Sequence, residues 1–376
     1  MSALDLPFDA DEMLAGLRPW VECESPTWDA VAVSRMMDLA ARDLSAIGAT
    51  VEMVPGTGPF GTSIRASFPH PDQGQPGILV SGHMDTVHPV GTLEKLPFRV
   101  EGGKAWGPGI MDMKGGNYVF LEAMRQIGRA GMTTPLPVTF LFTPDEEVGR
   151  PAPRSLIEDA ARGQRAVLVP EPALPDGGAV IGRYAIARFD LLTQGRPSHA
   201  GWALKDGRSA IAAMARRILQ IEAMTTEDCT FSVGVVHAGQ WVNCVASECR
   251  AEVLSMAKTQ VDLDQGVAAM LALQGEEAGV DFIVTRGVTR PVWEPRPGTM
   301  ALYDLARELS GQIGFEMSSD RAGGGSDGNF TGAMGVPTLD SIGVRGRGLH
   351  TLDEHIEVES LTERARLAAG LLTQIR

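Results

Sequence analysis

Hydrophobic residues recur along the first half of the chain in two alternating patterns. Residues 28–48 carry apolar side chains at helical spacing and end at Gly48, which suits a helix C-terminus. Three short apolar runs predict buried strands: ILVSG at 78–82, VTFLFT at 138–143 and AVLVP at 166–170. The stretch 115–130 predicts a helix between the first two strands. This alternation predicts an α/β domain with helices on both faces of a central sheet.

The pattern changes from about residue 180 onward. YAIARFDLLTQG (184–195) alternates as a long strand does. The predicted elements that follow it are a helix over 206–224, strands near 231–236 and 250–256, a helix near 262–278, and the strand DFIVTRG at 281–287. This β-α-β-β-α-β order is that of a ferredoxin-like α+β unit. We therefore predict an inserted domain at 180–289, within a domain made of both chain ends, 1–179 and 290–376.

Composition and charge narrow the function classes. With 376 residues, 44% hydrophobic and 21% charged, the chain is an ordinary globular protein, and its length favours two domains. A formal net charge of -14 argues against nucleic acid and anionic membrane surfaces as partners. The N-terminus has no signal-peptide pattern, no run predicts a membrane span, and the four cysteines show no Cys-x-x-Cys spacing. A cytoplasmic protein with reduced thiols is expected.

Five segments rich in polar and glycine residues are expected at strand ends or in the loops that follow them. They are SGHMDTV (81–87), GPGIMDMKGG (107–116), TPDEEVG (143–149), PEP (170–172) and GLH (348–350). In open α/β sheets, ligands bind at the edge where parallel strands end. These segments are therefore the candidates for a functional site.

His83, Asp85 and Asp112 have the chemistry of a metal site. Residues two apart in an extended segment point to the same side, so His83 could ligate a metal while Asp85 holds its ring. The Asp112 carboxylate has two oxygens and could bridge two metals, and the glycines around it would allow a close approach of the backbone. Taken alone, each segment also fits a structural role, such as helix capping by Asp112. His88 is expected to pack near the cleft.

The acidic pair Glu146 and Glu147 fits a hydrolase. Adjacent residues at a strand end point in different directions, so one carboxylate could bind metal while the other acts as a general base. An exposed acidic turn is the alternative. Glu171 and His350 follow the same logic as further ligands, although a lone histidine is more often a packing or surface residue.

Taken in order, these segments resemble a family of zinc aminopeptidase-like hydrolases. The family includes aminoacylases, glutamate carboxypeptidases, acetylornithine deacetylases and succinyl-diaminopimelate desuccinylases. The resemblance runs from VECESPT near residue 21 to GLHTLDEHIEVESL at 348–361, and HMDTV, GPGIMDMKGG, TPDEE and GGGSDG in one order are highly specific. The bacterial glutamate carboxypeptidase branch is the most similar, through HMDTVHPVGTL, GPGIMDMKGG and GVTRP.

The resemblance implies a site for two divalent metal ions, most often zinc, with cobalt or manganese as alternatives. The implied ligands are His83 and Glu171 for the first ion, Glu147 and His350 for the second, and Asp112 as the bridge. Asp85 would orient His83, Glu146 would be the general base, and the peptide bond between Asp112 and Met113 would be cis.

The resemblance also implies roles for the inserted domain, as a lid and as the contact of a homodimer. His199, in GRPSHAG (195–201), would reach the partner subunit's active site and stabilise an oxyanion. The implied substrate contacts are Asn243, Arg290, Gly324, Gly325 and Ser326. Arg290 would clamp a substrate carboxylate, because its planar fork matches two oxygens. Arg183, Arg286 and Arg321 are alternative clamps.

Two departures weaken a glutamate conjugate as the substrate. Ala246 stands where the family often has a proline, and Leu254 and Met256 stand where it often has an aspartate and an arginine. The expected substrate is therefore a small N-acyl or peptidyl amino acid with a free carboxylate. An N-acyl-amino-acid deacylase, another amide hydrolase or a deaminase is the alternative on the same site.

Two rival classes are further removed. A non-catalytic binding protein of the same fold is one. A dinucleotide oxidoreductase is the other, because GTGPFG (56–61) fits Gly-x-Gly-x-x-Gly. However, TSIRASF after it predicts a strand rather than the helix that pyrophosphate binding needs, so a loop is expected there.

Overall fold

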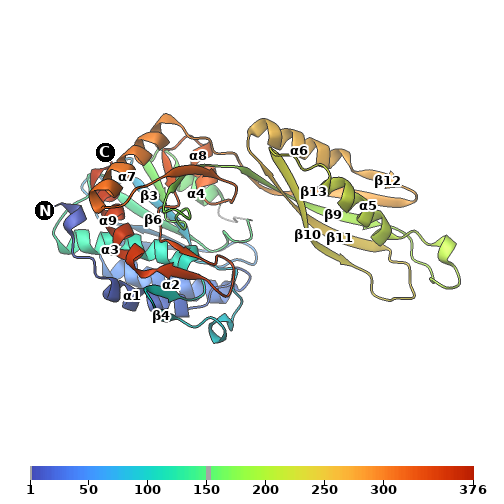
Figure 1. The fold of residues 1–376 in the computed structure, drawn as a ribbon, viewed down its shortest axis with the longest axis horizontal. Helices are drawn as coiled ribbons and strands as arrows, with labels where there is room; N and C mark the ends of the chain where they lie inside the picture. The colour runs from blue at the N-terminus through green and yellow to red at the C-terminus, as the bar shows by residue number, and fades with distance from the viewer. Residues whose placement is uncertain (1, 150–153) are drawn as a thin grey trace. The chain divides into compact units, whose positions relative to one another are not determined.

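The computed structural model describes residues 2–149 and 154–376. Contacts within the chain divide it into two compact units (Figure 1). The first unit comprises Met1–Gly182, Trp293–Ala322 and Ser326–Arg376, and the second comprises Arg183–Val292 with Gly323–Gly325. The second unit is thus inserted into the sequence of the first, and part of the glycine-rich loop groups with it.

A mixed sheet of eight strands forms the middle of the first unit. In spatial order the strands are β1 (Thr50–Val54), β2 (Ser63–Ser67), β6 (Val138–Thr143), β3 (Ile78–His83), β7 (Ala166–Val169), β15 (Thr338–Asp340), β8 (Ala179–Arg183) and β14 (Ser319–Ala322). β3 is parallel to β6 and β7, and β7 is parallel to β15. β2 is antiparallel to both β1 and β6. Four neighbouring parallel strands therefore end at one edge of the sheet.

Helices cover both faces of this sheet, which confirms the predicted α/β architecture. Ile78 and Val80 of β3 belong to a large core cluster, whereas Leu79 between them packs in a smaller one. The helices of the large core are α1 (Ala10–Glu22), α2 (Ala30–Ala46), α3 (Gly115–Arg129), α7 (Pro297–Ile313) and α9 (Val358–Gln374). Those of the smaller core are α4 (Arg154–Ala161) and α8 (Gly328–Ala333). Burial on both faces explains why β3 reads as a continuous apolar run.

A second, smaller sheet lies in the same unit. Its strands, in spatial order, are β16 (Gly346–Arg347), β17 (His355–Glu357), β5 (Lys104–Trp106) and β4 (Arg99–Glu101). The pairing of β17 with β5 holds the segment after His350 against the segment that leads to Asp112. Three short helical turns complete the unit: η1 (Ala3–Asp5), η2 (Thr92–Glu94) and η3 (Ile110–Lys114).

The second unit is an antiparallel sheet with two helices, as the predicted α+β insertion requires. Its strands, in spatial order, are β10 (Cys229–Ala238), β11 (Glu248–Ala257), β9 (Ala185–Gln194), β13 (Val280–Arg290) and β12 (Gly275–Glu277). Its helical elements are η4 (Leu204–Asp206), α5 (Ala210–Glu222) and α6 (Gln260–Ala272). Alternate residues of β9, such as Phe189 and Leu191, pack with Met214 of α5 and Met270 of α6 in one core. This chain order and strand order are ferredoxin-like, with β12 added at one edge.

The helix predicted over 262–278 is too long. Helix α6 ends at Ala272, and Gly275–Glu277 form β12, which pairs with β13. The connecting residues Ala278 and Gly279 both have positive φ, 54° and 76°, as a two-residue type I′ hairpin turn requires. An Ala-Gly pair is a weak signal for such a turn, so the sequence pattern predicted a helix that continued to residue 278.

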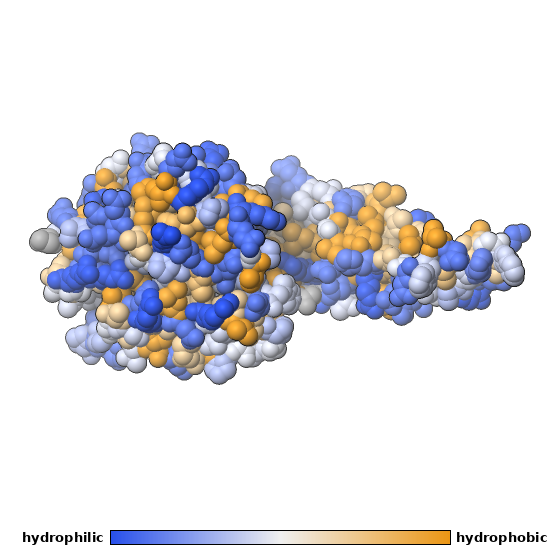
Figure 2. All heavy atoms as spheres, turned by 90° about the horizontal axis from the view of Figure 1, so that it is seen from below, coloured by the Kyte–Doolittle hydropathy of each residue, from blue (hydrophilic) through white to orange (hydrophobic). Residues whose placement is uncertain are grey.

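Apolar side chains are exposed on the second unit. Val235 and Val236 on the edge strand β10, and Ile211 and Leu219 on α5, are all exposed, and α5 packs against β10. Figure 2 shows patches of apolar surface on one face of this unit. Within the described ranges, no helix combines the length and the apolar character needed to cross a membrane.

Candidate metal centre

The ends of the central strands bring polar residues to one edge of the sheet. His83 is the last residue of β3 and pairs with Thr143, the last residue of β6. Glu146 and Glu147 follow β6, and Glu171 follows β7. This placement follows from the parallel pairing of β3 with both neighbours.

Asp112 reaches the same edge from another direction. It lies in η3, in the loop after β5 of the small sheet and directly before α3, so the segment follows a strand as predicted, although not a strand of the central sheet. The peptide bond between Asp112 and Met113 is cis, as the resemblance implies. Asp112 Oδ1 is 3.2 Å from His83 Nε2, and Oδ2 is 3.2 Å from His350 Nε2. One carboxylate thus lies between two histidines from distant parts of the chain.

Each of these histidines has a second carboxylate neighbour. His83 Nε2 is 3.8 Å from Glu171 Oε1, and His350 Nε2 is 3.1 Å from Glu147 Oε2. His350 lies between β16 and β17 with a positive φ of 61°. The result is two donor sets, each with one imidazole and one carboxylate, that share Asp112.

Asp85 ties His83 to the acidic turn after β6. The His83 Nδ1 lies 3.0 Å from the Asp85 carbonyl oxygen and 3.3 Å from Asp85 Oδ1. The buried Asp85 carboxylate accepts hydrogen bonds from the Thr27 hydroxyl at 2.6 Å and from the backbone N–H groups of Glu146 and Glu147, each at 3.2 Å. A proton on His83 Nδ1 leaves Nε2 available as a ligand. Asp85 therefore holds both the ring and the turn in place.

Glu354 was not identified from the sequence, yet it anchors the loop that carries Asp112. Its buried carboxylate accepts hydrogen bonds from the backbone N–H groups of Gly109 at 2.9 Å, Met111 at 2.8 Å and Asp112 at 3.1 Å. The same carboxylate lies 2.7 Å from His88 Nε2, so His88 does more than pack near the cleft. The one sequence signal was an acidic residue four positions after His350.

Gly116 serves a packing role rather than a close approach to a metal. A Cβ atom built on it would lie 1.9 Å from the carbonyl oxygen of Pro170, the residue before Glu171. The glycine therefore lets the start of α3 pack directly against the segment that carries Glu171. The sequence suggested that the glycines around Asp112 let the backbone approach a metal closely, whereas Gly116 lets two segments of the protein pack together.

The charges in this centre shift one another strongly. Burial raises the pKa of Glu147 to about 8 and the pKa of Glu171 well above its usual value, with the Asp112 charge adding to both. Although burial opposes it, hydrogen bonds from His350 and His83 hold the pKa of Asp112 far below its usual value. Hydrogen bonds to Asp112 and Glu147 raise the pKa of His350 to about 10. The pKa of His83 is raised as well, because its bonds to Asp112 and Asp85 outweigh burial.

The donor set fits two divalent ions. Ligand atoms about 2.0 Å from a tetrahedral ion lie about 3.3 Å apart, close to the separations around Asp112. Among the described residues, ligand atoms of His83, Asp112 and Glu147 lie within 4.8 Å of one another, as do those of His83, Glu146 and Glu171. Within the same part of the chain, the buried Glu147 Oε1 has no hydrogen-bond partner. Imidazole and carboxylate donors suit zinc, cobalt and manganese.

Ser326 lies in the first unit, beside the end of β15. Its hydroxyl donates a hydrogen bond to the Asp340 carboxylate, and its backbone N–H donates to Asn329 Oδ1 at 3.0 Å. The next residue, Asp327, accepts a hydrogen bond from the Ser81 hydroxyl of β3 at 3.0 Å. The loop is thus fastened to β15 and to β3, the strand that carries His83, and the motif GGGSDG alone did not predict these contacts.

The other candidate residues lie in the second unit. His199 forms a β-bridge with Cys244, and the carbonyl oxygen of Asn243 accepts the N–H of Ala200 at 2.9 Å. The His199 ring accepts a hydrogen bond at Nδ1 from the N–H of Gly201, 3.1 Å away. The structure therefore brings His199 and Asn243 together on neighbouring loops.

Arg290 and the glycine loop also meet within the second unit. A Cβ on Gly325 would lie 2.3 Å from the Arg290 guanidinium, and Arg183 donates a hydrogen bond to the Gly324 carbonyl oxygen at 2.8 Å. Arg183 and Arg290 are both buried. A larger residue at 325 would therefore displace the Arg290 side chain.

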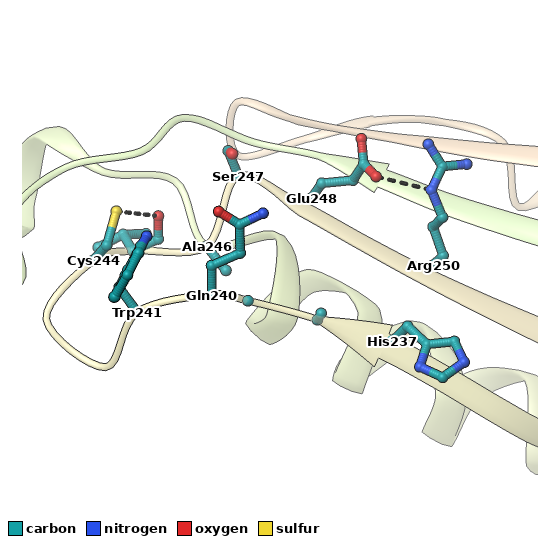
Figure 3. Close-up of a pocket in the computed structure, with 11 residues that line it drawn as sticks. His237, Gln240, Trp241, Cys244, Ala246, Ser247, Glu248 and Arg250 are labelled. Atoms are coloured by element: carbon teal, nitrogen blue, oxygen red, sulfur yellow. Dashed lines mark hydrogen bonds and ion pairs between the residues drawn. The ribbon is translucent and has the colours of Figure 1, made fainter.

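A hollow of about 470 Å³ lies at the hairpin between β10 and β11. Figure 3 shows Trp241 and Cys244 on its loop, with His237 on β10 and Arg250 on β11. Arg250 donates a hydrogen bond to Glu248 at 2.8 Å. The sequence pattern did not predict this hollow.

Comparison with known proteins places these residues in context. The model of peptidase family M20/M25/M40 matches residues 79–374. Carboxypeptidase G2 of Pseudomonas sp. (strain RS-16) is 31% identical over 377 residues, covering 96% of this chain and 88% of the relative. A succinyl-diaminopimelate desuccinylase of Thioalkalivibrio sulfidiphilus is 24% identical, covering 80% and 84% of the two chains.

Solved structures share the fold. A tripeptidase from Staphylococcus aureus subsp. aureus Mu50 superimposes with a TM-score of 0.82 at 20% identity, covering 98% of each chain. Aminopeptidase PepT from Bacillus cereus ATCC 10987 gives a TM-score of 0.76 at 21% identity, covering 98% of this chain and 99% of the other. At these identities the likeness concerns the fold alone.

Proposed function

Because this chain belongs to peptidase family M20/M25/M40, and is therefore a metal-dependent hydrolase of peptide or amide bonds, we propose a specific reaction for it. It cleaves the amide bond of an N-acyl or peptidyl amino acid that carries a free carboxylate, in the manner of a glutamate carboxypeptidase. The observation that carries the proposal is the Asp112 carboxylate, with one oxygen 3.2 Å from His83 and the other 3.2 Å from His350.

Two divalent ions, most readily zinc, would be held by the two donor sets. His83 and Glu171 would bind one ion, His350 and Glu147 would bind the other, and Asp112 would bridge them. When bound, such ions polarise the scissile carbonyl and lower the pKa of water to about 7. Asp85 would keep His83 in the tautomer that leaves Nε2 free for the ion, since Nδ1 faces the Asp85 carbonyl oxygen.

Glu146 would be the general base. Its carboxylate is buried and lies within 4.8 Å of ligand atoms of His83 and Glu171. Its backbone N–H is fixed by Asp85, 3.2 Å away. Glu146 would take a proton from the attacking water and return it to the leaving nitrogen.

Substrate recognition would rest on the second unit and on the glycine-rich loop. Arg290 would bind the substrate carboxylate, supported by its close approach to Gly325. Asn243, Gly324 and Ser326 would contact the rest of the substrate. Arg183, Arg286 and Arg321 are the alternative clamps, and Arg183 donates a hydrogen bond to the Gly324 carbonyl oxygen.

The protein would act as a homodimer joined through the second unit. The exposed apolar residues of β10 and α5 support this, because an edge strand and a neighbouring helix can pair with their copies. His199 would then complete the site of the partner subunit by stabilising the oxyanion. Its place beside Asn243 supports a joint role of the two loops.

A substrate panel tests the proposed reaction. Zinc-loaded protein is offered N-acyl amino acids and dipeptides, each as the free acid and as the C-terminal amide. The proposal predicts turnover of the acids and loss of most kcat/KM for the amides, with Arg290→Ala narrowing that difference. Equal turnover of acids and amides would contradict the carboxylate clamp and favour another amide hydrolase. No turnover by protein with full metal content would favour the binding-protein alternative.

A further inference from the structure

Lys114 is a buried charged residue that has no part in the proposed reaction. It is the last residue of η3, two positions after Asp112, and it is only 1% exposed. Taking an ammonium group out of water is costly unless hydrogen bonds and opposite charges compensate for the lost hydration. The partners of Lys114 therefore indicate what its burial achieves.

These partners come from segments around the metal centre. Lys114 Nζ donates a hydrogen bond to the carbonyl oxygen of Cys23 at 2.9 Å. Burial lowers the pKa of Lys114 to about 8, and the nearby groups that oppose this shift are Cys23, Glu354, Glu24 and Asp85. Three of these groups are carboxylates, which favour the charged ammonium. Lys114 is thus a buried cation among acidic groups from three separate segments.

The hydrogen bond from Lys114 reaches residues 23–27, which directly follow α1 and which we call the clasp segment. This segment runs beside the chain that leaves β3. The Ser25 hydroxyl donates to the Met84 carbonyl oxygen at 2.6 Å, and the Ser25 carbonyl oxygen accepts the Thr86 N–H at 2.9 Å. The clasp segment is therefore hydrogen-bonded to the chain directly beyond β3.

Thr27 links the clasp segment to the rest of the centre. Its side chain is buried, and its hydroxyl donates to Asp85 Oδ2 at 2.6 Å. The same carboxylate lies 3.3 Å from His83 Nδ1 and accepts the N–H groups of Glu146 and Glu147. One hydroxyl group is thus connected, through one carboxylate, to a proposed ligand of each ion and to the proposed base.

The turn that carries Asp112 meets the same region by close packing. Gly109, directly before η3, has a positive φ of 70°. A Cβ atom built on Gly109 would lie 2.4 Å from Thr86 Cγ2 and 3.5 Å from Lys114 Cε. The turn therefore packs directly on Thr86, and the Lys114 side chain runs beside this contact to the clasp segment.

We propose that Lys114 is a positioning residue for the metal centre, because it joins the turn that carries Asp112 to the clasp segment and thereby to Asp85. Lys114 holds the clasp segment, Thr27 of that segment holds Asp85, and Asp85 holds His83 and the acidic turn after β6. The two sides of the donor set thus keep their separation before any ion binds. This inference rests on the donor sets of the proposed function and is independent of the substrate.

Hydrogen exchange of the metal-free protein tests the positioning without metal or substrate. In Lys114→Met, which keeps a long side chain but no charge, the N–H groups of Thr86, Glu146 and Glu147 should exchange about 10-fold faster or more. Thr27→Val should have the same effect at the two glutamates, whereas Thr27→Ser, which keeps the hydroxyl, should not. N–H groups within β3 provide the reference for any global change. Unchanged exchange at the three positions in Lys114→Met would overturn the proposal.

Zinc affinity, measured by competition with a chromophoric chelator, tests the consequence for the metal centre. Lys114→Met and Thr27→Val should each weaken zinc binding by about 10-fold to 100-fold, as changes to partners of metal ligands usually do. The double variant should bind about as weakly as the weaker single variant, because both changes act through one segment. Lys104→Met, at an exposed position of β5, is the matched control and should bind zinc like the wild type. A double variant weakened by the product of the two single effects would overturn the shared segment.

The two measurements separate this inference from the proposed function. A wild type that binds no zinc would contradict the proposed donor sets, while faster exchange in Lys114→Met would still support the clasp segment as the link. A wild type that binds two ions, together with a Lys114→Met variant unchanged in exchange and in zinc affinity, would overturn the role of Lys114 and leave the proposed function standing.

Discussion

Glu146 and Glu147 are adjacent in the chain, but their carboxylates have different neighbours. Glu147 Oε2 lies 3.1 Å from His350 Nε2. A carboxylate oxygen of Glu146 instead lies within 4.8 Å of ligand atoms of His83 and Glu171. Asp85 holds both backbone N–H groups, so the turn presents its two side chains in fixed and separate directions. We therefore assign a ligand role to Glu147 and a proton-transfer role to Glu146.

This assignment predicts opposite behaviour for two matched variants. Glu146→Gln should retain both metals and lower kcat by about 10²–10⁴-fold, because the base is lost while the donor sets stay intact. Glu147→Gln should bind the second metal weakly. Elemental analysis and kcat per bound metal distinguish the two variants. If Glu146→Gln loses metal while turnover per metal is kept, the roles are reversed.

The protonation of the metal-free centre predicts a second effect. Without metal, the raised pKa values of Glu147, about 8, and His350, about 10, keep this pair at least partly protonated at pH 7. A metal ligand must be deprotonated, so binding should release protons, and the apparent affinity should rise with pH between 6 and 8. Calorimetry at pH 7 in two buffers of different ionisation enthalpy measures the release. A binding enthalpy independent of the buffer would contradict this picture.

At the scale of elements, the site is built where parallel strands end and where the small sheet holds two loops together. β17 pairs with β5, and Glu354 directly before β17 accepts three N–H groups of the Gly109–Asp112 loop. Asp112 and Glu354, which this contact joins, are 242 residues apart in the sequence. This contact sets the position of the Asp112 carboxylate, the proposed bridge between the two ions.

Glu354 is therefore a positioning residue with a measurable effect on metal binding. Glu354→Gln should keep the fold but weaken metal affinity by about 10-fold to 100-fold, as partners of metal ligands usually do. Glu354→Ala should also lower the free energy of unfolding by about 1–3 kcal/mol, the cost of leaving a buried donor unpaired. Asp353→Ala, at the exposed neighbouring position, is the control and should change neither. Unchanged metal affinity in Glu354→Gln would refute the role.

The limits of sequence-based prediction follow from the same contacts. The apolar runs of β3, β6 and β7 were sufficient to predict the parallel strands, because burial on both faces leaves a continuous hydrophobic signal. The family resemblance supplied the donor residues and the cis bond. Glu354 was missed because three of its partners are backbone N–H groups, which leave no residue pattern, and the fourth, His88, lies 266 residues away in the sequence. Strand β12 was not predicted because the Ala-Gly pair of its turn did not interrupt the helical pattern of the sequence.

At the scale of the whole molecule, the proposed catalytic residue His199 and the proposed metal ligands belong to different units. His199 and Asn243 lie together in the second unit, and the donor sets lie in the first. A homodimer would allow the second unit of one subunit to serve the partner. The exposed apolar residues of β10 and α5 are the surface that such a dimer would bury.

Mixing two inactive variants tests this arrangement. His199→Ala and Glu146→Gln should each keep metal content and dimer mass, and each should be nearly inactive alone. In a mixed dimer, one site draws Glu146 from one chain and His199 from the other. Equal mixing should restore about a quarter of wild-type activity, since half of the dimers have one intact site. Activity that stays at the level of the separate variants, or a fully active monomer, would exclude the contribution in trans.

The central claim is that Asp112 bridges two metal ions, and the metal content of purified protein tests it most directly. After dialysis against zinc and then against metal-free buffer, the wild type should hold two ions per chain. Asp112→Ala should lose most of both, because one residue serves both donor sets. Asp38→Ala, on the surface of α2, should keep two. Retention of both ions by Asp112→Ala, measured by elemental analysis on folded protein, would contradict the account.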